Sequence, residues 1–107
     1  NRAIAKRKLK DYYGAISDYT KAIEIRPAED AYFNRGKAKS DLNDLYGGIS
    51  DYTEAIEINP KYVKAYKNRS IAKEKIGDIK GACIDARKAF SLGNEDPLDK
   101  NWINDNC

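Results

Sequence analysis

The sequence predicts an all-α fold in which antiparallel helix pairs stack side by side. Three observations predict it. The segment SDYTKAIEIRP at 17–27 returns as SDYTEAIEINP at 50–60, and a shorter unit starting Asn-Arg occurs three times in step with it. Ala22, Ala55 and Ala89 are separated by 33 and then 34 residues. No segment alternates apolar and polar residues over strand length, so we expect no sheet. Repeats of this period indicate two-helix units, each covering its apolar flank with its neighbour.

The first repeat is expected to hold two helices joined by a turn. Residues 1–9 are interpreted as the end of one helix, and 11–14 as a short turn. Apolar residues at helical spacing then predict a second helix from Ala15 to Ile25. Pro27 ends that helix, because proline lacks the amide hydrogen that a continuing helix needs.

Four further helices follow the same pattern. They are expected at about 29–42, 46–58, 63–76 and 79–92. Asn43-Asp44 and Gly77-Asp78 supply the turns, and the aspartates are expected to cap the helices that follow. Pro60 ends one helix, and Gly93 stands where a helix C-cap glycine is expected.

The last segment, 97–105, is predicted to be a short amphipathic helix that covers the last pair. Asp96 followed by Pro97 is a typical helix start. Leu98 and Trp102 lie one turn apart, and the end of a repeat stack needs such a cover. The alternative is a mobile acidic tail.

The chain is expected to form one domain over residues 1–107. It divides into a partial repeat 1–27, complete repeats 29–60 and 63–94, and the capping helix 97–105. No apolar run is long enough to cross a bilayer. Since Asn1 falls in mid-repeat, the targeting of a longer parent chain is not visible.

The residues of a catalytic or metal site do not stand out. Cys83 and Cys107 are the only cysteines, with no metal-ligand spacing, and histidine is absent. Two cysteines do not make a disulfide framework, so we expect a reducing cytoplasm, with Cys83 as a small core residue and Cys107 exposed. We therefore expect no enzyme, no catalytic residue, no metal and no cofactor.

The repeated pattern Ala-x-x-x-Tyr-x-x-Ala, closed by proline, resembles the tetratricopeptide repeat. Ala15, Tyr19, Ala22 and Pro27 show it in the first copy, while the last copy has Asn94 in place of the proline. The resemblance covers roughly 1–94. It implies an α-solenoid of two complete units and an N-terminally truncated one, whose first helices line a concave surface that binds another protein.

The chain departs from that family at two positions of the first helices. Where the family usually has leucine and tyrosine, each copy has arginine and lysine: Arg2 and Lys6, Arg35 and Lys39, Arg69 and Lys73. An aspartate also recurs in the second helices, as Asp18, Asp51 and Asp85. We expect the arginines to pair with these aspartates across helices. The alternative is that both are solvated, in which case each pair contributes only about 0–1 kcal/mol.

The first helices carry many more basic than acidic side chains, which predicts a positively charged groove. By resemblance, the groove-facing residues are Ile4, Arg7, Phe33, Asn34, Lys37, Lys64, Lys67, Asn68 and Ile71. Such a groove attracts an acidic peptide. Some members of the family bind a C-terminal carboxylate. Asn34 and Lys64 match that pattern and Ile4 and Asn68 do not, so we do not expect a faithful carboxylate clamp.

Three other interpretations stay open at this stage. The groove lysines are ordinary solvated helix charges, or the open end of the first repeat docks on a second copy and the domain self-associates. Nucleic acid is the less favoured partner, because the tyrosines that could stack on bases occupy core positions. No membrane partner is expected.

Overall fold

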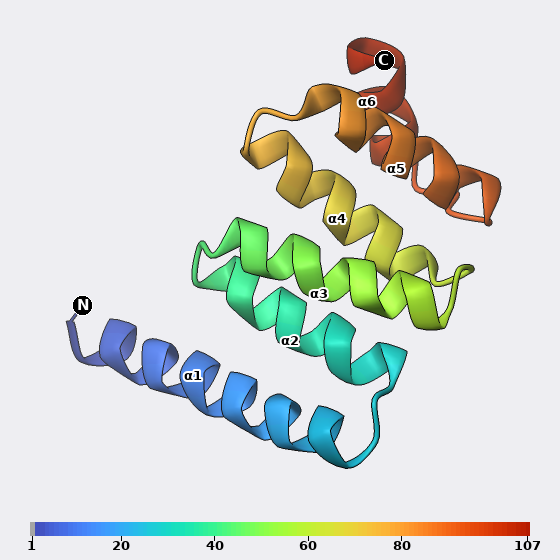
Figure 1. The fold of residues 1–107 in the computed structure, drawn as a ribbon. Coiled ribbons are helices and arrows are strands. Elements are labelled where there is room, and N and C mark those ends of the chain that lie inside the picture. The colour runs from blue at the N-terminus through green and yellow to red at the C-terminus, as the bar shows by residue number, and fades with distance from the viewer. Residues whose placement is uncertain (1) are drawn as a thin grey trace.

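The computed structural model describes residues 2–107, with side chains from residue 11 onward. The described residues form six α-helices and no strand, which confirms the all-α prediction. The helices are α1 (Arg2–Ile25), α2 (Glu29–Asp41), α3 (Leu45–Ile58), α4 (Val63–Lys75), α5 (Ile79–Ser91) and α6 (Pro97–Asn106). Figure 1 shows α1 to α5 side by side in chain order, as a helical solenoid requires.

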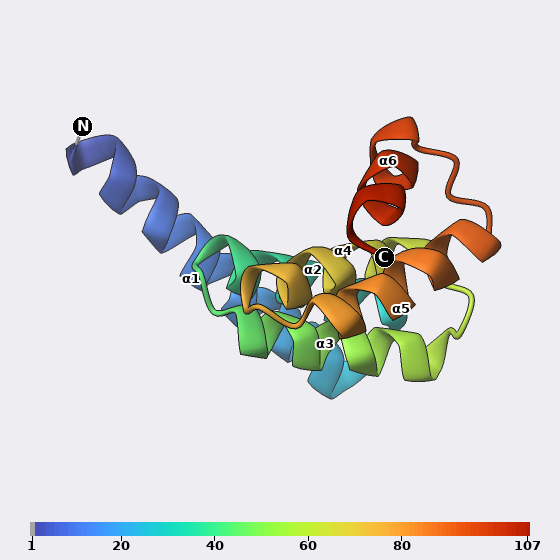
Figure 2. The same cartoon turned by 90° about the horizontal axis from the view of Figure 1, so that it is seen from above.

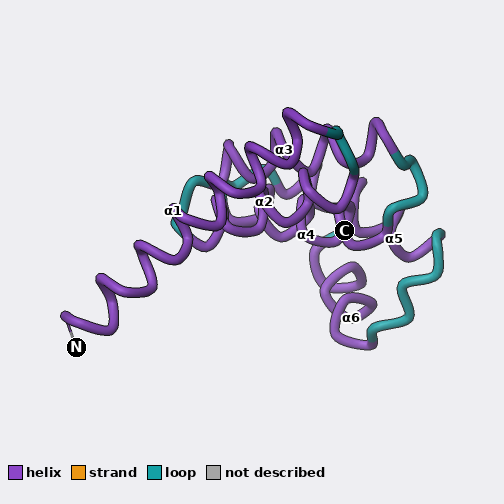
Figure 3. The backbone as a smooth tube through the Cα atoms, turned by 90° about the horizontal axis from the view of Figure 1, so that it is seen from below, coloured by secondary structure: helices purple, strands orange, loops and turns teal. Residues whose placement is uncertain are grey.

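The helices form two layers. α2 and α4 lie in one layer, and α3 and α5 lie in the other (Figures 2 and 3). The N-terminal half of α1 and the whole of α6 project from the α2–α4 side, at opposite ends of the stack. The face formed by α2 and α4 is therefore bounded by these two helical segments.

The core depends on small residues where helices cross. A Cβ atom built on Gly36 of α2 would lie 3.0 Å from the backbone oxygen of Gly48 on α3, which is closer than a side chain tolerates without a shift. This close approach buries Tyr52, which is only 1% exposed, next to Ala55 and Ala65. The repeated glycine and alanine positions thus set the distance between helices, and the tyrosine fills the space between them.

The turns between α2 and α3 and between α4 and α5 have the same chemistry. Asn43 (φ 68°) and Gly77 (φ 89°) adopt left-handed conformations, which asparagine and glycine tolerate best. The following Asp44 and Asp78 cap α3 and α5, each accepting a hydrogen bond from a backbone amide three residues later at 3.0 Å. The predicted turns and caps are confirmed here.

The predicted turn at 11–14 is wrong, because α1 runs without a break from Arg2 to Ile25. Lys10 stands where the other repeats have Asn43 and Gly77. A left-handed conformation costs lysine roughly 1–2 kcal/mol, and glycine avoids that cost, so the chain stays helical through this point. The first repeat is one long helix instead of a closed pair.

The capping helix forms where it was predicted, as α6. The Asp96 carboxylate accepts a hydrogen bond from the Leu98 amide at 3.0 Å, and Pro97 opens the helix. α6 packs on α5. None of the described helices has the length and apolar character needed to cross a membrane.

Candidate functional site

A hollow of about 130 Å³ opens between α2 and α4. It is lined by Lys37, Ser40, Asp41, Leu45, Tyr52, Asn68, Ile71, Ala72 and Lys75. Three residues of the predicted groove, Lys37, Asn68 and Ile71, meet here. The other lining residues lie at the end of α2, in α3, which contributes the buried Tyr52, and in α4.

The hollow mixes charged, polar and apolar groups. The hydroxyl of Tyr52 lies 3.3 Å from Ser40 Oγ and donates a hydrogen bond to it. Burial raises the pKa of Tyr52, so this hydroxyl stays neutral. Lys37 and Lys75 supply positive charge, but Asp41 lies in the same lining, so the hollow is less basic than the sequence suggested. A ligand here would meet ammonium groups beside the apolar side chain of Ile71, which is 41% exposed.

A second hollow of about 190 Å³ lies where α4, α5 and α6 meet. Its lining is Lys67, Ser70, Ile71, Glu74, Ala86, Ala89, Asn94, Leu98, Asp99 and Trp102. Ile71 belongs to both hollows, so they adjoin along α4. α6 closes one side of the second hollow.

Lys67, a predicted groove residue, is engaged by the chain's own C-terminal segment. Its Nζ lies 3.2 Å from a carboxylate oxygen of Asp96 and 3.2 Å from one of Asp99. Hydrogen bonds to Asp99 and Asp96 raise the pKa of Lys67. Two turns further along α4, the indole nitrogen of Trp102 donates to a carboxylate oxygen of Glu74 at 3.0 Å. The acidic tail beside a basic groove was visible in the sequence, but this pairing was not inferred.

The remaining predicted groove residues lie elsewhere. Phe33 is 9% exposed, with its ring centroid 5.7 Å from that of Tyr52 and 5.5 Å from that of Tyr62. The prediction that Phe33 offers an apolar contact in the groove is wrong, because its ring is buried in the core against Tyr52 and Tyr62. Asn34 is half-buried and Lys64 is exposed, and neither lines the two hollows. Ile4 and Arg7 lie in α1, and their side chains fall outside the described part of the chain.

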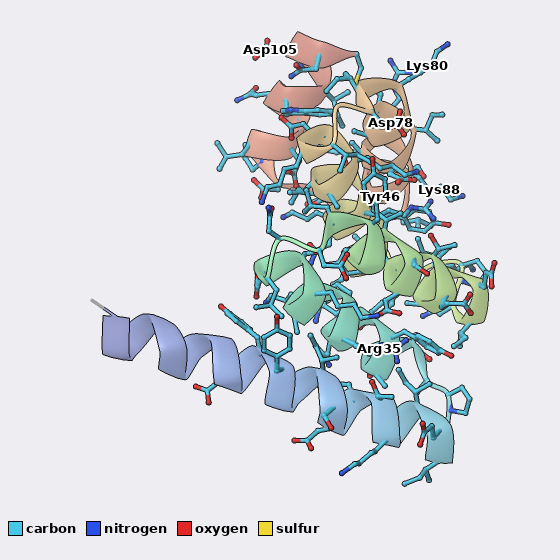
Figure 4. The ribbon with its side chains drawn as sticks, turned by 60° about the vertical axis from the view of Figure 1, so that its left-hand side comes forward. Arg35, Tyr46, Asp78, Lys80, Lys88 and Asp105 are labelled. Carbon is cyan, nitrogen blue, oxygen red and sulfur yellow. A yellow bond between two sulfur atoms is a disulfide. The ribbon has the colours of Figure 1, made fainter. Side chains whose placement is uncertain are left out.

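The predicted arginine–aspartate pairing is confirmed in both complete repeats. The guanidinium of Arg35 donates two hydrogen bonds of 2.8 Å to the carboxylate of Asp51, and Arg69 makes the same pair with Asp85 at 2.7 Å. Figure 4 labels Arg35 on α2, beside α1. Asp51 is 2% exposed and Asp85 is 1% exposed. These arginines neutralise buried carboxylates, so they serve the fold and are not free to bind a ligand.

Each pair extends into a network that links consecutive repeats. Lys39 and Lys73 approach the same two carboxylates at 3.3 and 3.0 Å. The third guanidinium nitrogen, Nη1, donates to a threonine hydroxyl of the preceding helix: Arg35 reaches Thr20 of α1 at 3.3 Å, and Arg69 reaches Thr53 of α3 at 3.2 Å. The recurrence of threonine two residues after the aspartate was a signal for this link that the sequence analysis did not use.

Comparison with known proteins identifies the family to which this repeat belongs. The model of the tetratricopeptide repeat family matches residues 1–29 and 29–62, which is more than half of the chain. The chain belongs to the tetratricopeptide repeat family. Domains of this family generally mediate protein–protein interaction. A comparison with curated protein sequences finds no match.

Solved tetratricopeptide structures share the whole architecture. The first such domain of Spaghetti (RPAP3), bound to the HSP90 peptide SRMEEVD, superposes with a TM-score of 0.84 at 25% identity, over 97% of this chain and 83% of that one. The tetratricopeptide domain of Arabidopsis OM64 gives 0.83 at 31% identity, over 94% and 84%. Yeast Tom70 gives 0.84 at 26% identity, over 91% of this chain but 20% of that one.

The cysteines of this tetratricopeptide domain form a disulfide, Cys83–Cys107. The prediction of two unpaired cysteines is wrong. α5 and α6 run antiparallel, so the beginning of one helix meets the end of the other, and the two Cα atoms lie 5.8 Å apart. Arg87 Nη2 also donates to the carbonyl oxygen of Cys107 at 3.3 Å. The bond and this contact hold α6 on α5.

Proposed function

We propose that this domain binds an extended peptide segment of another protein across the face of α2 and α4. The observation that carries the proposal is the hollow between these helices, where Lys37, Asn68 and Ile71 converge. The similar Spaghetti domain holds a peptide, which supports the same class of ligand here. The role is that of a non-catalytic scaffold.

The composition of the hollow favours a particular peptide chemistry. Lys37 and Lys75 attract a carboxylate, and the amide of Asn68 can donate a further hydrogen bond. Asp41 in the same lining repels additional negative charge. We therefore expect preference for a single acidic side chain beside an apolar one that packs on Ile71, and no preference for a long acidic run.

Lys67 contributes less to this proposal than the sequence suggested. A partner that used its ammonium group would have to displace Asp96 and Asp99, which already lie 3.2 Å away. Peptide contacts are thus expected at the α2–α4 hollow.

Fluorescence anisotropy with labelled SRMEEVD, and with a version in which one glutamate is replaced by leucine, tests the proposal. We expect tighter binding of the leucine version, and at least about tenfold weaker binding after the double change Lys37→Glu and Lys75→Glu, a loss of roughly 1.4 kcal/mol. The matched control is Lys80→Glu with Lys88→Glu, two exposed lysines of α5 (Figure 4). Equal weakening by the control pair, or tighter binding of a labelled oligonucleotide than of either peptide, would contradict the proposal.

A second candidate function is self-association. It is favoured by the exposure of Asp18 and Ala22 on α1, whose counterparts in the later repeats are buried. Cytoplasmic localisation stays a prediction from the sequence. That prediction was based on the absence of a disulfide framework, and the Cys83–Cys107 disulfide no longer supports it.

A further inference from the structure

The C-terminal segment of the chain lies against α4 with the chemistry expected of a bound peptide. Asp96 and Asp99 each place a carboxylate oxygen 3.2 Å from Nζ of Lys67. Leu98 and Trp102 line the hollow beside the same lysine. Carboxylates next to apolar side chains therefore occupy a basic residue of α4.

The position that α6 occupies adjoins the hollow proposed for the peptide. Ile71 lines both hollows, and Lys67 lies one helical turn before it on α4. One turn is about 5.4 Å, which two residues of an extended peptide span. Figure 2 shows α6 on the same side of the stack as the face of α2 and α4. A peptide that extends from Ile71 toward Lys67 therefore meets α6.

The noncovalent contacts of α6 are weak. No residue of α6 is buried, so the helix adds little to the apolar core. Its ion pairs with Lys67 join side chains that are between 26% and 36% exposed, and exposed pairs contribute little to stability. The hydrogen bonds that join it to other helices include Trp102 to Glu74 and Arg87 to the carbonyl oxygen of Cys107.

The covalent bond is the stronger restraint on α6. The chain joins the beginning of α6 to the end of α5, and the Cys83–Cys107 disulfide joins the end of α6 back to α5. With both ends attached, α6 stays at a high effective concentration over α4. With the bond broken, α6 is attached at one end only, and its weak contacts alone oppose its separation from Lys67.

We propose that α6 is a tethered competitor of the peptide at Lys67, and that reduction of the Cys83–Cys107 disulfide by a dithiol releases α6 and strengthens the binding of acidic peptides. Resting on the proposed peptide function, this regulation acts on the same face of α4. Lys67 is available only in the molecules from which α6 has moved away. The apparent dissociation constant is therefore raised by the inverse of their fraction.

The reduction is a thiol–disulfide exchange in two steps. Cys107 is exposed and Cys83 is only 9% exposed, so a thiolate of the dithiol reaches Sγ of Cys107 first. Its attack forms a mixed disulfide and breaks the bond to Cys83, whose thiolate leaves and takes up a proton. The second thiol of the reductant then displaces Cys107, which becomes a thiol. The two cysteines gain two electrons and two protons, and the dithiol becomes a cyclic disulfide.

Fluorescence anisotropy of labelled SRMEEVD with the oxidised domain, and with the domain reduced by dithiothreitol, tests the proposal. We expect reduction to tighten binding at least about tenfold, as it must if α6 is in place in about nine of ten oxidised molecules. The peptide with one glutamate replaced by leucine should gain less, because it offers Lys67 one carboxylate fewer. Cys107→Ser should bind as reduced wild type does, with or without the reductant, which controls for the reductant itself.

Substitutions at the ion pairs locate the competition. Lys67→Gln should lose most of the gain on reduction, whereas Lys80→Gln, the same change at an exposed lysine of α5, should keep it. Asp96→Asn with Asp99→Asn removes the competing carboxylates and leaves the disulfide intact. Asparagine also caps helices, so α6 should still form. We expect this oxidised double variant to bind SRMEEVD more tightly than oxidised wild type does.

The reactivity of Lys67 is a second measurement that needs no peptide. Brief acetylation with an N-hydroxysuccinimide ester, mapped by mass spectrometry, should modify Lys67 faster after reduction, relative to Lys80 in the same sample. Circular dichroism verifies that each variant is folded. Equal affinities for SRMEEVD in the two redox states, an unchanged relative reactivity of Lys67, or a full gain in Lys67→Gln would overturn the proposal. If Lys67 becomes more reactive but binding does not depend on Lys37 and Lys75, the proposed function fails and the release of α6 stands.

Discussion

The outermost helices at the two ends of the stack, α1 and α6, pack differently on their neighbours. At the C-terminal end, α6 folds back antiparallel on α5, and a disulfide and the Lys67 ion pairs hold it there. At the N-terminal end, α1 stays straight and leaves Asp18 and Ala22 exposed. Every pair of the repeat needs cover on both sides. The described chain thus covers its last pair with α6, whereas one face of α1 is exposed.

The largest expected difference in stability is between two substitutions at equivalent positions of α3 and α1. Asp51→Asn removes the buried carboxylate that pairs with Arg35, and we expect it to lower the free energy of unfolding by about 3 kcal/mol, because the half-buried guanidinium is left without its counter-charge. Asp18→Asn changes an exposed residue and should alter the monomer's stability by less than about 0.5 kcal/mol. Urea denaturation measures both. A double-mutant cycle of Asp51→Asn with Arg35→Gln that shows no coupling would contradict the role assigned to the pair.

Removal of the disulfide tests the covered end. Cys107→Ser opens a loop that joins residues 24 apart, and loop entropy alone predicts a loss of about 3.5 kcal/mol. α6 should then leave α4 and α5, so the emission of Trp102, the only tryptophan, should move to longer wavelength. An unchanged spectrum and an unchanged denaturation curve would show that the ion pairs hold α6 without the bond. The reduced wild-type protein is the second arm and should behave as the variant does.

Enlarging the alanine at equivalent positions of α3 and α1 compares a buried position with an exposed one. Ala55 is fully buried in the core, so Ala55→Leu should overpack it and cost about 1–3 kcal/mol. Ala22→Leu makes the same enlargement at an exposed position and should change monomer stability by less than about 0.5 kcal/mol. Thermal denaturation at low concentration measures the difference. Equal losses at the two positions would mean that the face of α1 is covered in solution.

The smallest expected effect is a pH dependence at the covered end. A hydrogen bond from the Leu98 amide, and then the contact with Lys67, lower the pKa of Asp96 below its ordinary value. Because the folded pKa is the lower one, this contribution is fully present above about pH 4 and is lost as pH falls through the lowered value. Trp102 emission should therefore be constant near neutral pH and shift only in acid. Asp96→Asn should lack this acid step, and an identical step in that variant would assign it to another carboxylate.

Local pattern predicted most of the fold because the repeat is encoded in short segments. The helices from α2 onward, the Asp44 and Asp78 caps and the Asp96 helix start all depend on residues within a turn or two of one another. The arginine–aspartate pairs were also predictable, since the same two residue types recur at the same spacing. The break expected at 11–14 failed for a local reason as well: Lys10 does not favour the left-handed turn.

The candidate site was less predictable, because it depends on which long-range neighbour each side chain meets. The sequence by itself determined the helices from α2 onward, their pairing and the excess of basic residues in the first helices. Only the tertiary structure decided that Phe33 lies in the core, that Lys67 is neutralised by α6, and that Cys83 reaches Cys107. The physical reason is that helical periodicity fixes a side chain's direction around its own axis, whereas its burial and partners depend on where segments distant in sequence pack against it.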